Sequence, residues 1–184
     1  MISWASGLAH AHMPAGSRVE YGDVFIALAE IAVAIAGFSG IVAVFGARSA
    51  GQWTRDDRLR LAFLLVCSLT VVFFSLLPFA MTALHLPATV LWRAASGLLA
   101  IWLVLGNILA FRSIALVRHE FQSESRPWLK GLVRAGDTAS VVLLFYNVIW
   151  MAEVGLFLLA LLWLLLQSVI MFAELLGFTA GRAV

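Results

Sequence analysis

Long apolar runs separated by short polar segments dominate the pattern along the chain. The first three runs cover residues 24–47, 58–84 and 92–112. A helix needs about 20 apolar residues to cross a hydrocarbon core of about 30 Å. Each of these runs therefore predicts one transmembrane helix.

The last apolar stretch, residues 139–178, admits two arrangements. Its only charged residues are Glu153 and Glu174, and as one helix it would extend about 60 Å, twice the hydrocarbon thickness. A helical hairpin that turns at residues 152–155 would place Glu153 in water and Trp150 at the interface. The alternative is one long, bent helix.

We prefer the hairpin, and the fold class is then an all-α integral membrane protein, a polytopic transmembrane helix bundle. Five spans are expected, and four spans with a long, bent last helix are the alternative. The predicted spans are residues 24–47, 58–84, 92–112, 133–151 and 156–177.

Residues 1–184 form a single transmembrane domain in this prediction. Ten of the twelve Lys and Arg residues follow the first, third and last spans, and cationic loops are retained on the cytoplasmic side. This bias predicts that residues 1–23 lie outside and that residues 118–137 form a cytoplasmic loop. The expected location is a bacterial inner membrane. Pro127 can open an interfacial helix within that loop. The C-terminus is cytoplasmic with five spans and outside with four.

Composition narrows the function classes. The chain is 63% hydrophobic and 12% charged, with a mean hydropathy of +1.02, whereas soluble domains carry about a quarter charged residues. A soluble globular enzyme and a disordered chain are therefore excluded. The net charge of +2 does not suggest a nucleic-acid partner, and one cysteine excludes an intrachain disulfide.

Glu30 is the most informative polar residue, because it lies about 10 Å below the outer end of the first span by helical rise. A carboxylate at that depth is costly unless it is paired, protonated or facing water. Asp23 and Gly37 lie seven residues to either side and share nearly the same face. Glu30, Asp23 and the intramembrane Asn147 are the candidates for an ion or proton pathway.

Asn107, Asn147 and Gln167 are polar residues inside predicted spans. Our default interpretation for all three is a hydrogen bond between helices, since such bonds hold membrane helices together.

Small residues form a second pattern in the first span. Ala32, Ala36 and Gly40 repeat at four-residue spacing, with Gly37 between them. Small side chains let two membrane helices approach closely. Contact with the protein's own helices is the favoured interpretation of this packing seam, and self-association is the second.

The sequence offers no assigned catalytic residue, cofactor or metal site. His10, His12 and His85 are weak metal candidates, because they do not lie at a fixed spacing on one rigid element. Cys67, Ser39 and His85 show no arrangement of a nucleophile with a base. An enzyme is therefore not favoured, and the expected partners are the lipid bilayer with other copies of the chain or other membrane proteins.

Three functional hypotheses remain at this point. The first is a self-associating channel or transporter-like bundle for small ions or protons, with Glu30 as its site. The second is a non-catalytic accessory or scaffold subunit of a larger membrane complex. An intramembrane enzyme is the least favoured.

Overall fold

The computed structural model describes residues 16–49, 55–116 and 127–181, and within these residues every regular element is helical. The elements are α1 (Gly16–Ser49), α2 (Arg55–Thr82), α3 (Ala88–Leu116), α4 (Pro127–Tyr146), a π-helical turn η1 (Asn147–Met151) and α5 (Val154–Gly181). Five helices are long and apolar enough to cross a membrane. Their spans are Tyr21–Val44, Arg58–Thr82, Ala88–Leu109, Gly131–Met151 and Val154–Leu176.

The prediction of an all-α bundle with five spans is confirmed, and the four-span alternative is wrong. The last apolar stretch is divided into two helices, α4 and α5, because the chain turns at Ala152 and Glu153. Ala152 adopts the left-handed conformation, with φ of 55°. These five helices indicate a multi-pass integral membrane protein.

Asn147 holds the turn between α4 and α5 together. Its Nδ2 donates to Ser96 Oγ of α3 at 2.9 Å and to the carbonyl of Glu153 at 2.8 Å. Its Oδ1 accepts the backbone N–H of Glu153 at 2.8 Å, and the N–H of Ala152 donates to its carbonyl. A fully buried amide needs such partners, since an unpaired polar group costs several kcal/mol in lipid. The Asn147 side chain thus supplies hydrogen-bond partners for the backbone N–H and C=O groups of Glu153, which lie where the helix is interrupted.

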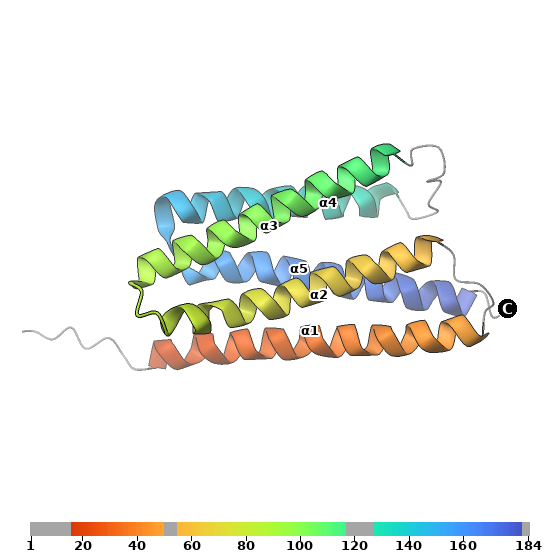
Figure 1. Cartoon of the computed structure of the whole chain (residues 1–184), viewed down its shortest axis with the longest axis horizontal. Coiled ribbons are helices and arrows are strands. Elements are labelled where there is room, and N and C mark those ends of the chain that lie inside the picture. The colour runs from red at the N-terminus through yellow and green to blue at the C-terminus, as the bar shows by residue number, and fades with distance from the viewer. Residues whose placement is uncertain (1–15, 50–54, 117–126, 182–184) are drawn as a thin grey trace, which may run out of the picture.

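The five helices lie side by side, with the start of α1, the α2–α3 turn and the α4–α5 turn at one end (Figure 1). α2 and α5 pack on one another, α3 and α4 flank them on one side, and α1 packs against α2 and α5. Because α1 lies at the edge of the bundle, one of its long faces is left without a helix from the described part of the chain.

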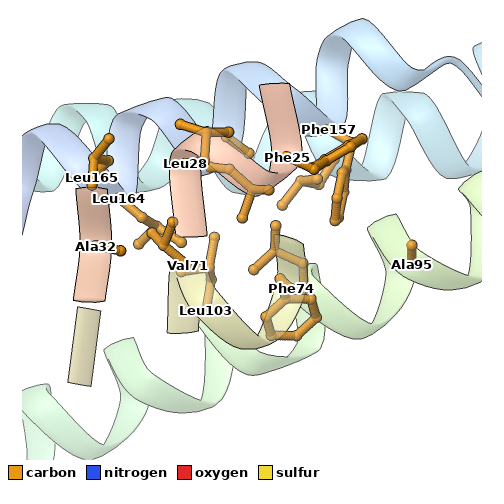
Figure 2. Packing of buried hydrophobic residues seen from close by; sticks show 14 of the residues in the cluster. Phe25, Leu28, Ala32, Val71, Phe74, Ala95, Leu103, Phe157, Leu164 and Leu165 are labelled. Carbon is orange, nitrogen blue, oxygen red and sulfur yellow. The ribbon is translucent and has the colours of Figure 1, made fainter. Parts of the chain in front are cut away.

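The core joins all the helices through apolar side chains. Near the start of α1, the rings of Phe25, Trp92 and Phe157 lie with each pair of centroids 6.0 Å apart, and Phe79 meets Phe25 edge-on at 6.4 Å. Figure 2 shows Phe25 beside Phe157, with the core continuing from them along the helices. This aromatic cluster connects α1, α2, α3 and α5, so it fixes which face of α1 points inward.

Candidate functional site

α1 has one face in the core and one face outside the bundle. Phe25, Leu28, Ala32 and Ser39 are buried. The opposite side carries a row of exposed residues, here called the outer seam: Asp23, Ala27, Glu30, Ala34, Gly37, Ile41 and Val44. These seven residues are spaced alternately by four and three, which is the spacing of contact positions in left-handed helix pairs.

Glu30 is the third of the seven residues along the outer seam. It is nine residues into the span Tyr21–Val44, so its depth is about 14 Å by helical rise, deeper than the sequence-based boundary indicated. Its side chain is exposed, and no hydrogen bond or ion pair to another described residue reaches it. A charged side chain at this depth costs about 3 kcal/mol if lipid surrounds it. The carboxyl group is therefore stable at this depth only if it is protonated, meets water or gains a partner from outside the described part of the bundle.

The small residues predicted to form a packing seam point in two directions. Ala32 is fully buried against the protein's own core and Ala36 is partly buried. Gly37 and Gly40 are exposed, and a methyl group added at either one would meet no atom within 4 Å. Ala32 thus packs against the protein's own helices, whereas Gly37 and Gly40 lie open on the outer side of α1, and self-association through them stays a prediction.

The other two pathway candidates, Asp23 and Asn147, lie in different parts of the bundle. Asp23 is exposed on the outer seam, two turns before Glu30, as the spacing predicted. Asn147 is buried at the α4–α5 turn, and no hydrogen bond among the described residues joins it to Asp23 or Glu30. Its role in a pathway stays a prediction.

The weak metal candidates are only partly placed. His85 is exposed in the turn after α2, where its φ is 55°. His10 and His12 lie outside the described residues. Within the described ranges, no group of three or more His, Cys, Asp or Glu side chains is arranged to hold a metal ion.

A second polar site, inside the bundle, joins α2, α4 and α5. Asp137 of α4 accepts a hydrogen bond at Oδ1 from Trp163 Nε1 of α5 at 3.2 Å and another at the same oxygen from Gln167 Nε2. The Oε1 atom of Gln167 in turn accepts from Cys67 Sγ of α2 at 3.8 Å. We call these four residues the Asp137 cluster.

Tight backbone packing positions the Asp137 cluster. Trp163 lies so close to Gly136 that a methyl group built at this glycine would overlap the indole ring. The absence of a side chain at Gly136 thus lets the indole reach the adjacent Asp137. Trp163 and Gln167 are four residues apart on α5 and lie on one face, so both N–H groups approach the carboxylate together.

No role was predicted for Asp137, which falls where the predicted loop 118–137 overlaps the predicted span 133–151. In the structure α4 begins at Pro127, and Asp137 lies six residues into the span Gly131–Met151. The default interpretation of Gln167 as a link between helices fits its contacts with α2 and α4. Asn107 instead donates to the carbonyl of Leu103 in its own helix.

Comparison with protein family models finds no match, and comparisons with curated proteins and with solved structures find none either. The function of the protein is therefore inferred from the Glu30 site and the Asp137 cluster.

Proposed function

We propose that this protein is a self-associating membrane bundle in which the α1 outer seams of several copies face one another and enclose a path for small cations or protons. Glu30 is the site on that path. The observation that carries the proposal is the exposed carboxyl group of Glu30 inside the span Tyr21–Val44, on the outside of the bundle.

The path in this proposal lies between copies and not within one copy. The interior of the single bundle is filled by side chains with no exposed surface, among them Leu64, Leu99, Leu144 and Phe157. Glu30 faces away from this interior. A carboxyl group on the outer face can serve transport only where another protein surface completes its surroundings, since hydrocarbon cannot solvate an ion.

Self-association fits the rest of the outer seam. In this proposal all copies insert with the same orientation, so their α1 helices pair in parallel and bring Glu30 residues to the same depth. Ala27, Ala34 and Gly37 surround Glu30 on the seam, and their small side chains permit a close approach of backbones. Carboxyl groups at one depth in a shared path form a ring, the arrangement that selects for cations in channels.

Flux through proteoliposomes tests this function. We expect Glu30→Gln to reduce proton or alkali-cation flux by roughly tenfold or more, the equivalent of about 1.4 kcal/mol, because the amide cannot bind a proton or balance a cation. Glu153→Gln is the matched control, since Glu153 is an exposed carboxylate at the α4–α5 turn. The control should conduct like the native protein. Native protein without flux, or equal flux from Glu30→Gln, contradicts the proposal.

An accessory role is the second candidate, favoured by the exposed glycines Gly37 and Gly40. This open surface accepts a helix of another membrane protein as readily as a second copy. In that case the partner would supply a hydrogen-bond donor or a cationic side chain to Glu30. Purification in mild detergent separates the two candidates: a stable complex with a different membrane protein supports the accessory role, and a homo-oligomer supports the shared path.

A further inference from the structure

The Asp137 cluster has the properties of a binding site that the proposed function does not use. Asp137 is only partly exposed and lies about 9 Å into the α4 span by helical rise, near the end where α4 begins. Ionisable groups inside membranes are costly, and they mark functional sites by default. Gln167 and Cys67, which continue the hydrogen-bond chain from Asp137, are both buried.

The chemistry of the donors selects a proton as the ligand. Two N–H groups, from Trp163 and Gln167, are directed at Oδ1 of Asp137. They stabilise negative charge on the carboxylate but repel a metal ion, which also prefers several oxygen ligands. The carboxylate is the single anionic oxygen ligand in the cluster. A proton needs one oxygen, so it fits where a metal cation does not.

We propose that Asp137, Gln167 and Cys67 form an intramembrane proton-binding site in which the side-chain amide of Gln167 turns over when Asp137 takes up a proton. With Asp137 ionised, Gln167 donates to the carboxylate and accepts the Cys67 S–H, as observed. With Asp137 protonated, the carboxyl O–H donates to Oε1 of Gln167, and Nε2 of the turned amide donates to the Cys67 sulfur. One proton enters from water, and the Cys67 S–H loses its acceptor.

Few other charges surround the cluster. On α5, Glu174 lies two turns beyond Gln167 and forms an ion pair with Arg60 of α2 at 3.9 Å. On α4 itself, Arg134 is exposed one turn before Asp137. The sequences of α3 between Arg93 and Arg112 and of η1 contain no titratable side chain. Cys67 is the titratable neighbour contributed by α2. A pH response of the cluster that disappears when Asp137 is replaced therefore belongs to the Asp137 carboxyl group.

The chain contains one cysteine, so its S–H stretching band in infrared spectra reports on Cys67 alone. We expect this band, recorded from protein in lipid bilayers, to shift to higher frequency as the pH falls, because the thiol loses Oε1 as its acceptor. The shift should share its midpoint with the appearance of the Asp137 carboxyl band. Circular dichroism defines the pH range in which the helices stay intact.

Two variants make the test specific. Asp137→Asn keeps an oxygen that accepts from Trp163 and Gln167, so the bundle should fold, and its S–H band should not respond to pH. Gln167→Leu should leave the Asp137 carboxyl band titrating while the S–H band no longer moves. A native S–H band that is insensitive to pH, or one that shifts equally in Asp137→Asn, overturns the proposal. Glu30→Gln should keep the native response, so this result is independent of the proposed pathway.

Discussion

Substituting Gly136 by alanine is expected to be the most destabilising single change in the α4–α5 interface. A methyl group at this position would overlap the ring of Trp163, and the backbone of α4 lies too close for the indole to remain in place. Overpacking of this kind costs about 1–3 kcal/mol and occasionally more. Displacing the indole would also remove its hydrogen bond to Asp137. Together we expect a loss of about 2–5 kcal/mol.

Helix propensity alone gives the opposite sign for Gly136→Ala, since alanine is favoured over glycine in a helix interior by about 1 kcal/mol. Gly131→Ala is the matched control, because Gly131 lies in the same helix and an added methyl group there meets no atom within 4 Å. Unfolding in bilayer-mimetic micelles by a denaturing detergent measures both variants. Gly131→Ala should be neutral or stabilising, and similar stability of the two variants would contradict the packing account.

Substituting Gly37 by leucine is expected to weaken self-association of the bundle without unfolding it. The glycine faces outward with no atom near its added methyl group, so the single chain can hold leucine. Two facing outer seams cannot approach as closely when leucine stands beside Glu30. The loss of close packing should cost about 1–3 kcal/mol per contact, which corresponds to a tenfold to hundredfold weaker association.

Gly106→Leu is the control for the Gly37 variant. Gly106 is an exposed glycine in α3, and an added methyl group there also meets no atom within 4 Å. Energy transfer between labelled copies in bilayers, measured over a range of protein-to-lipid ratios, gives the association constant. Equal constants for Gly37→Leu and Gly106→Leu would show that α1 is not the contact face.

The fold was predictable because hydropathy and length decide it. Each span is long enough and apolar enough to cross a bilayer, and the last stretch is too long for one crossing. The turn at Ala152 and Glu153 falls where a charged residue interrupts that stretch. Asn147 also donates a hydrogen bond to Ser96 of α3, a contact between helices that the sequence of the turn alone does not encode.

Which face of α1 packs against the other helices was only partly predictable. Helical spacing placed Asp23, Glu30 and Gly37 on one side, and the structure agrees. Both sides of α1 contain small and apolar residues, however, so the pattern does not tell which side meets α2 and α5. The aromatic cluster around Phe25 decides this orientation through residues of three other helices.

The Asp137 cluster was missed because its components are far apart in the sequence. Asp137 lies at the end of a polar stretch, where the predicted loop 118–137 overlaps the predicted span 133–151, so its depth was ambiguous. Its placement in the bundle follows from the fit of Trp163 against Gly136, which is a tertiary contact. The spacing of Trp163 and Gln167 on α5 was visible in the sequence, but nothing in it identified the carboxylate that both would contact.

Cysteine cross-linking in bilayers tests most directly whether the outer seams of two copies meet. Cys67→Ser provides the background, with a single cysteine then introduced at Ala34 on the seam or at Ala62, an exposed residue of α2. A disulfide forms where Cα atoms of two copies come within about 7 Å. We expect oxidation to give covalent dimers from Ala34→Cys and none from Ala62→Cys. Monomers from both variants, or equal dimer yields from both, would contradict a shared path at Glu30.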